Sequence, residues 1–147
     1  MKKNAILGLL SLTSMVLASA MVNARTPGHA CEYLLINIKN DTPFNCYVIK
    51  RTLKNGGIQQ AYVYKVPSGT TSRAFDLAEG FGGINMTLTY ECNEGRNITF
   101  NSVKPACIKG DMITGTILST QNMDATFSVT PGSYWAGTPG IINWTFY

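Results

Sequence analysis

The sequence contains 147 residues, of which 45% are hydrophobic and only 14% are charged, with 12 lysines and arginines against 8 aspartates and glutamates. This length supports one domain with a single core rather than two domains. The near-neutral balance, with basic residues scattered along the chain, argues against a nucleic-acid partner, which would require a basic stripe.

The beginning of the chain has the order of a bacterial secretory signal peptide. Two lysines give a positive start, an uncharged run rich in Ile, Leu, Met and Val extends over 5–17, and small residues follow. Cleavage is expected after Ala24, with Ala20 as the alternative position. The predicted organisation is a signal peptide at 1–24 and one domain at 25–147, which is secreted or remains in the periplasm.

Four cysteines lie in the predicted mature chain, and an even number in an exported protein predicts two disulfides. Three pairings are possible. We expect Cys31–Cys46 and Cys92–Cys107, because each pair is fifteen residues apart and closes a local loop. A zinc site would need cysteines two to four residues apart, so no metal is expected.

Most of the mature chain shows the pattern of short strands. Segment 84–90 alternates apolar and polar residues without a break, which is typical of a half-buried strand. Ile98 and Phe100 repeat the alternation beyond a turn at 93–95, so a hairpin is predicted over 84–102. The other expected strands are 33–39, 46–53, 60–66, 70–77, 113–118, 126–130 and 141–146.

This series of strands predicts an all-β fold, an antiparallel β-sandwich of eight to nine short strands with two disulfides. Helical periodicity is weak, and at most one or two helical turns are expected over 75–81, before a glycine-rich turn. In the last strand Ile142, Trp144 and Phe146 share one face, which predicts that this face lies in the core.

Residues that could carry catalysis are few. His29 is the only histidine and lies near the predicted mature terminus, where chains are usually mobile and cannot hold a catalytic triad. The pairs Asp76/Glu79 and Glu91/Glu94 could support acid–base chemistry, but their positions near turns favour a solvated or turn-stabilising role. The chain is predicted not to be an enzyme and to need no cofactor.

Segment 132–140 places two large aromatic residues, Tyr134 and Trp135, among small residues and turn formers. Two interpretations remain open: the rings fold back and plug one end of the sandwich, or they are exposed for contact with a lipid, a sugar or a protein. Tyr62 and Tyr64 share one face at strand spacing, which favours packing on a sheet.

Several short motifs suggest a relationship. Tyr90-Glu91-Cys92, Ile98-Thr99-Phe100 and the segment 132–144 resemble small, mostly uncharacterised exported proteins of intracellular gammaproteobacterial pathogens, which are candidate substrates of type II secretion. More distantly, the strand layout looks like the aegerolysin and actinoporin β-sandwiches, whose members bind membrane lipids. The resemblance implies a lipid-binding role, but the chain lacks the long amphipathic helix of actinoporins, so it does not imply a pore.

The leading hypothesis is therefore an exported, non-enzymatic binding module that contacts a lipid membrane or a host protein. Tyr134 and Trp135 would insert shallowly into the partner, and the cluster Lys50, Arg51 and Lys54 would attract anionic headgroups if it shares their side. The alternatives are a periplasmic structural or inhibitor-type protein that binds another protein, and a hydrolase that uses a hidden site among the carboxylates.

Overall fold

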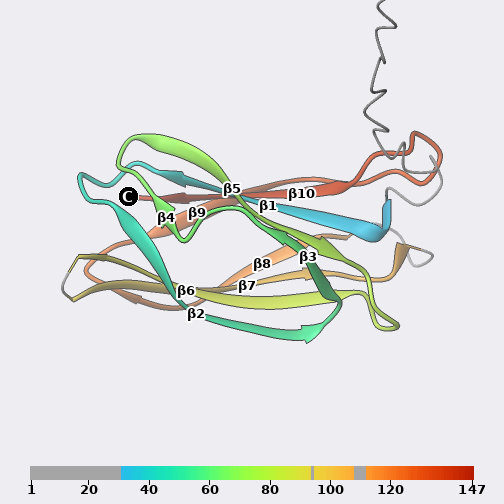
Figure 1. Ribbon diagram of the computed structural model, residues 1–147, viewed down its shortest axis with the longest axis horizontal. Helices are drawn as coiled ribbons and strands as arrows, with labels where there is room; N and C mark the ends of the chain where they lie inside the picture. The colour runs from blue at the N-terminus through green and yellow to red at the C-terminus, as the bar shows by residue number, and fades with distance from the viewer. Residues whose placement is uncertain (1–30, 94, 108–111) are drawn as a thin grey trace, which may run out of the picture.

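The described part of the chain forms a two-layer sandwich of ten strands in two five-stranded sheets (Figure 1). The structure is a computed structural model and describes residues 31–93, 95–107 and 112–147. The all-β sandwich predicted from the sequence is confirmed. The predicted signal peptide, His29 and Glu94 lie outside the described residues. Among the described residues, no helix is long and apolar enough to cross a membrane.

Sheet A has the order β3-β5-β1-β10-β9. Every neighbouring pair in it is antiparallel except β1 and β10, which run parallel, so the expected purely antiparallel arrangement is wrong at this one pair. A parallel pair needs a long connection between its strands, and here the rest of the domain supplies it. The strands are β1 (Tyr33–Asn40), β3 (Gly57–Ala61), β5 (Thr70–Ala78), β9 (Ala125–Thr130) and β10 (Gly140–Phe146).

Sheet B has the order β4-β2-β6-β7-β8 and contains the predicted hairpin as β6 and β7. Its strands are β2 (Cys46–Asn55), β4 (Lys65–Val66), β6 (Ile84–Asn93), β7 (Arg96–Lys104) and β8 (Thr114–Gln121). The chain passes from β2 in this sheet to β3 in sheet A through Gly56, whose φ of 93° is readily available only to glycine.

Two local predictions are wrong. The strand expected over 60–66 is divided into β3 and β4, and residues 62–64 between them belong to no strand. The helical turns expected over 75–81 are absent, because Phe75 and its neighbours extend β5, which pairs with β1 on one side and β3 on the other. In both cases pairing with distant strands overrides the local pattern.

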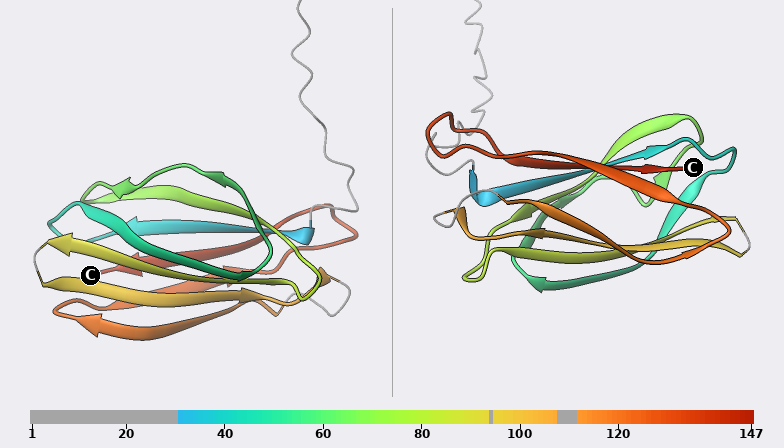
Figure 2. Two further views of the ribbon diagram at one scale, coloured as in Figure 1. Left: turned by 60° about the horizontal axis from the view of Figure 1, so that its bottom comes forward. Right: turned by 180° about the vertical axis from the view of Figure 1, so that it is seen from behind.

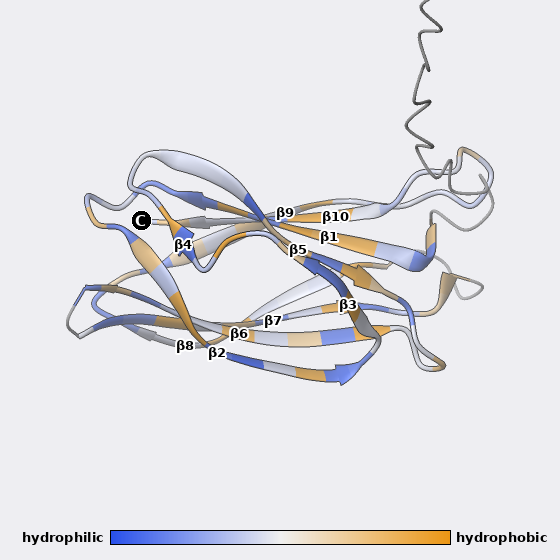
Figure 3. Cartoon of the chain, viewed as in Figure 1, coloured by the Kyte–Doolittle hydropathy of each residue, from blue (hydrophilic) through white to orange (hydrophobic). Residues whose placement is uncertain are grey.

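The alternating residues meet in the core as predicted. Ile84, Met86, Leu88 and Tyr90 of β6 are buried and face the buried side of β10. Figure 3 shows the hydrophobic colour along most of β1 and the hydrophilic colour on β3 at the edge of sheet A. Aromatic rings fill the centre of the core, with the Phe100 and Trp144 ring centroids 4.3 Å apart and those of Tyr90 and Phe146 5.3 Å apart.

Each disulfide joins segments that are distant in the chain. Cys31 pairs with Cys107 and Cys46 pairs with Cys92, so the predicted pairs Cys31–Cys46 and Cys92–Cys107 are both wrong. The reason lies in the sheet: β2 and β6 are neighbours, and their register places Cys46 next to Cys92. Cys31 precedes β1 at the end of the sandwich where Cys107 follows β7.

Candidate functional site

The loop between β9 and β10 is a small, internally bonded hairpin. Ser133 and Thr138 exchange two backbone hydrogen bonds of 2.9 and 3.0 Å. Within this bridge the Gly137 amide donates to the Tyr134 carbonyl at 3.3 Å, and Gly137 has a φ of 62° that suits glycine. The turn therefore holds Tyr134 and Trp135 at its apex.

Both aromatic rings of this loop project into solvent. Trp135 is 93% exposed and Tyr134 is 54% exposed, and their rings meet edge to face at a centroid distance of 5.4 Å. The interpretation that they plug the sandwich is therefore wrong. Ile113, which is buried, closes that end instead, because its Cδ1 lies only 2.6 Å from where a Cβ on Gly140 would stand.

Two further exposed apolar side chains belong to the same end of the sandwich. Phe81 is fully exposed at the apex of the β5–β6 turn, where Gly80 and Gly83 exchange backbone hydrogen bonds. Met112 is 76% exposed immediately before Ile113. The views in Figures 1 and 2 agree that the β5–β6 turn and the β9–β10 loop lie at one end of the molecule. We call the four exposed side chains the apolar tip: Phe81, Met112, Tyr134 and Trp135.

Buried interactions fix the loops behind the apolar tip. Glu79, at the start of the β5–β6 turn, accepts a hydrogen bond from the Cys107 amide at 2.9 Å and lies 3.4 Å from the ammonium group of Lys104. Lys104 is completely buried, and Cys107 is bonded to Cys31. Of the solvated or turn-stabilising role expected for Glu79, these contacts support the second, because they tie the start of the β5–β6 turn to the segment after β7.

The predicted basic cluster lies elsewhere in the fold. Lys50, Arg51 and Lys54 are all exposed on β2, which belongs to sheet B near the edge formed by β4. The aromatic loop instead follows β9, which is an edge strand of sheet A. Lys54 is one residue from the end of β2 nearest the tip, whereas Lys50 and Arg51 are in mid-strand, about 10 Å or more farther along. The structure therefore does not gather the cluster around Tyr134 and Trp135.

The carboxylates considered for catalysis do not form one site. Asp76 is buried, and it accepts hydrogen bonds from Arg73 Nε at 2.5 Å, Arg73 Nη2 at 2.7 Å and the Tyr62 hydroxyl at 2.7 Å. It is a buried structural group that pairs with Arg73, and the solvated or turn-stabilising role expected for it is wrong, since it lies within β5. Glu91 lies near the end of β6 in sheet B, opposite Tyr47 of β2. Glu79 precedes the start of β6, so the length of this strand separates the two carboxylates. Within the described part of the chain, no group of three or more potential metal ligands occurs.

Sequence reasoning found Tyr134 and Trp135 but missed Phe81 and Met112. Phe81 stands alone between glycines in Gly80-Phe81-Gly82-Gly83. A large apolar residue with no periodic partner has no core face to join, and this signal could have identified it. The exposure of Met112 could not be predicted, because it depends on where β8 begins and on which of Met112 and Ile113 faces the core.

The fold of this chain is similar to that of three solved structures of low sequence identity. No family model and no curated protein sequence matches the chain. The solved structure of the lipid binding protein Nakanori superposes with a TM-score of 0.62 and 9% identity, over 78% of this chain and 70% of that one. The structure of IP-1A from Alcaligenes faecalis superposes with a TM-score of 0.54 and 9% identity, over 80% of this chain and 92% of that one. The structure of RahU in complex with a TRIS molecule superposes with a TM-score of 0.48 and 10% identity, over 80% of this chain and 97% of that one. At such low identity the likeness is one of fold alone.

Proposed function

We propose that this protein is a non-enzymatic lipid-binding module that attaches to a membrane surface through its apolar tip. The observation that carries the proposal is the exposure of four apolar side chains on three segments at one end of the sandwich. Large apolar side chains that are exposed together at one end of a protein are candidates for a contact surface. Loops on a rigid scaffold are also where binding residues concentrate.

The chemistry of the tip suits the interface between lipid and water. Tyr134 and Trp135 combine an apolar ring with a polar group that can remain at the level of the headgroups. Phe81 and Met112 carry no polar group that insertion would desolvate, apart from the thioether of Met112. The arrangement therefore supports shallow insertion rather than crossing of the bilayer.

The expected strength is modest. Complete burial of one such side chain contributes about 1.5–3 kcal/mol, so half-burial of four would contribute about 3–6 kcal/mol. This corresponds to weak, reversible binding. Because Glu79 ties the β5–β6 turn to Cys107 and the Ser133–Thr138 bridge holds the β9–β10 loop, little ordering of these two loops would oppose the association.

Other features support the proposal. The Nakanori structure, described as that of a lipid binding protein, shares the fold. Two disulfides are compatible with a location outside the cytoplasm, in agreement with the predicted export of the chain. Lys54, exposed near the tip end of β2, would add a weak attraction to anionic headgroups.

Sedimentation with lipid vesicles tests the proposal. Vesicles of phosphatidylcholine, with and without phosphatidylserine, are mixed with the wild type and with Trp135→Ala, Phe81→Ser and Tyr64→Ala. Tyr64 is the matched control, because it is an exposed aromatic residue in the segment between β3 and β4. We expect about tenfold weaker binding for each tip variant and no change for the control. Absence of wild-type binding to both kinds of vesicle, or full binding by Trp135→Ala, would contradict it.

A further inference from the structure

A recessed surface lies on sheet B, at the end of the sandwich away from the apolar tip. It is a hollow of about 320 Å³ beside the Cys46–Cys92 disulfide, at the end of the sandwich formed by the start of β2 and the end of β6. This volume is at the lower limit of small-molecule sites. The side chains around the disulfide are Phe44, Asn45, Tyr47, Glu91 and Asn93.

The lining combines aromatic surface with hydrogen-bonding groups. Tyr47 is 46% exposed and lies directly opposite Glu91 in the β2–β6 register, so the ring and the carboxylate share the outer face of the sheet. Asn45 and Asn93 add two side-chain amides, which can donate and accept hydrogen bonds. The Asn45 Oδ1 already accepts a hydrogen bond from the Ser68 amide at 3.3 Å, which leaves the Asn45 Nδ2 as the donor that this side chain can offer.

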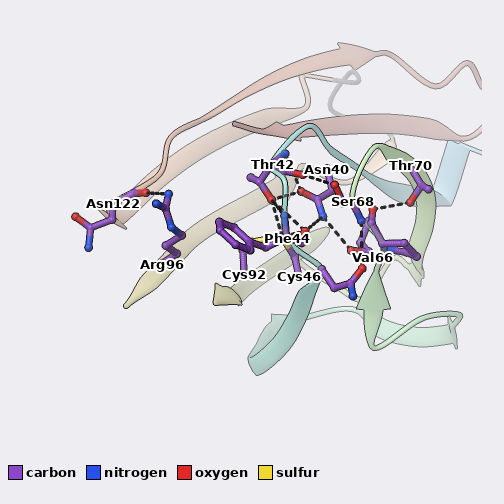
Figure 4. The surroundings of a disulfide bond; sticks show 12 residues. Asn40, Thr42, Phe44, Cys46, Val66, Ser68, Thr70, Cys92, Arg96 and Asn122 are labelled. Carbon is purple, nitrogen blue, oxygen red and sulfur yellow. Dashed lines mark hydrogen bonds between the residues drawn. A yellow bond between two sulfur atoms is a disulfide. The ribbon is translucent and has the colours of Figure 1, made fainter. Parts of the chain in front are cut away.

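The wall of the hollow is fixed before any ligand binds. Buried Asn40 donates from Nδ2 to the carbonyl oxygens of Phe44 at 2.7 Å and Val66 at 3.0 Å, and its Oδ1 accepts the Thr42 amide and hydroxyl at 3.1 and 2.7 Å. The Arg96 guanidinium lies 5.2 Å from the centroid of the Phe44 ring. Figure 4 shows this network around the disulfide. A site held in this way binds without first ordering its loop.

The charges around the hollow disfavour strongly charged ligands. Glu91 faces the space and would repel phosphate or sulfate. Lys65, whose Nζ is 6.0 Å from the Tyr47 ring centroid, and Arg96 together offset the attraction that one carboxylate would exert on a cation. An uncharged ligand with many hydrogen-bonding groups fits best.

We infer that this hollow binds a neutral saccharide. A pyranose ring has an apolar face of C–H groups that can stack on Tyr47, and its hydroxyl groups can donate to the Glu91 carboxylate and bond with the amides of Asn45 and Asn93. Charge-assisted hydrogen bonds from hydroxyls to Glu91 would be the strongest of these contacts.

The same face of sheet B offers room for a longer saccharide. The register continues from Tyr47 and Glu91 to a row in which Lys50 is opposite Thr89, and Thr89 is opposite Thr99. A second hollow of about 220 Å³ lies over these residues and is lined mainly by threonines. The Thr89 and Thr99 hydroxyls are 3.0 Å apart, which leaves ordered hydroxyl groups beside the first hollow. Affinity should therefore increase with the number of sugar units.

The experiment measures binding of neutral oligosaccharides to the full-length mature protein by calorimetry, with hexose and N-acetylhexosamine oligomers of increasing length as probes. We expect saturable binding by the wild type that tightens with length. Tyr47→Ala and the nearly isosteric Glu91→Gln should each weaken it about tenfold or more. Tyr47→Phe keeps the ring and should keep most of the affinity, which separates stacking on the ring from hydrogen bonding to the Tyr47 hydroxyl.

Two controls separate this site from the apolar tip. Trp135→Ala should bind saccharides like the wild type, and Tyr47→Ala should still sediment with vesicles. Failure of every probe to bind the wild type, or unchanged binding by both Tyr47→Ala and Glu91→Gln, would overturn the inference and leave the lipid-binding proposal intact.

Discussion

Trp144 donates a hydrogen bond from its indole Nε1 to the Ser102 hydroxyl at 3.0 Å and thereby joins β10 of sheet A to β7 of sheet B inside the core. Both residues are completely buried. The contact satisfies the indole N–H, which would otherwise be desolvated without an acceptor. It also fixes the orientation of the largest ring in the core, against Phe100.

Replacing Trp144 by Phe should lower the free energy of unfolding by about 2–3 kcal/mol without abolishing folding, because an aromatic ring remains but the hydrogen bond and some buried area are lost. Ser102→Ala should be less costly in the Trp144→Phe background than in the wild type, because the serine hydroxyl has then already lost its partner. Urea unfolding of the four proteins gives the coupling, expected to be about 1 kcal/mol. A coupling near zero would show that the two side chains do not interact.

The disulfide pairing can be tested by peptide mapping without reduction. We expect peptides that link Cys31 to Cys107 and Cys46 to Cys92, and none that link Cys31 to Cys46. The double variant Cys46→Ala/Cys92→Ala should lose about 4 kcal/mol of stability, since the bond closes a loop with a sequence separation of 46. It should retain the other disulfide, and recovery of the local pairs instead would contradict the strand order of sheet B.

Burial raises the pKa of the Tyr90 phenol well above its usual range, and its hydroxyl has no hydrogen-bond partner among the described residues. In the unfolded chain the pKa is about 10, so above that pH the unfolded state releases a proton that the folded state retains. Stability should therefore fall as the pH rises above about 10. Tyr90→Phe removes this contribution to the pH dependence and should be neutral or stabilising at pH 7, because it removes an unsatisfied polar group. Unfolding curves at several alkaline pH values measure both effects, and a clear loss of stability in Tyr90→Phe at pH 7 would contradict them.

Gly83, in the β5–β6 turn, should tolerate no side chain. Its φ is 91°, and a Cβ there would stand 2.3 Å from the Lys104 carbonyl oxygen and 2.9 Å from the Ala106 amide nitrogen. Gly83→Ala should therefore destabilise the protein by about 2 kcal/mol or more, because backbone atoms would have to move. Gly57→Ala is the matched control, since a Cβ there meets nothing within 4 Å. Equal melting temperatures for the two variants would contradict the described packing of this turn.

The sandwich could be predicted from the sequence because buried and exposed side chains alternate along its strands, and this period of two is visible in the order of apolar and polar residues. Ile84 to Tyr90, and Ile142 with Trp144, lie in the core as the alternation predicts. Features that depend on pairing between strands distant in the chain could not be predicted. Nothing local indicates that Cys46 faces Cys92, or that β10 runs parallel to β1, because both follow from the order of strands in the sheets.

The candidate tip was predictable only in part for the same reason. An aromatic pair in a turn sequence identified Tyr134 and Trp135, but exposure depends on what else closes the end of the sandwich. That residue is Ile113, which reaches Gly140 from a segment more than twenty residues earlier. That Phe81 and Trp135 belong to the same end of the molecule likewise follows from the topology, which places the β5–β6 turn and the β9–β10 loop at that end.

The chain contains two tryptophans with opposite environments, and fluorescence can therefore report on the tip alone. Trp135 is 93% exposed, whereas Trp144 is buried. In Trp144→Phe, which keeps only Trp135, addition of vesicles should shift the emission to shorter wavelength, and lipids brominated near the headgroup should quench it. In Trp135→Phe, which keeps only Trp144, neither change should occur. If the emission of Trp135 stays that of a solvated indole at saturating lipid, the apolar tip does not enter the membrane and the proposed function is wrong.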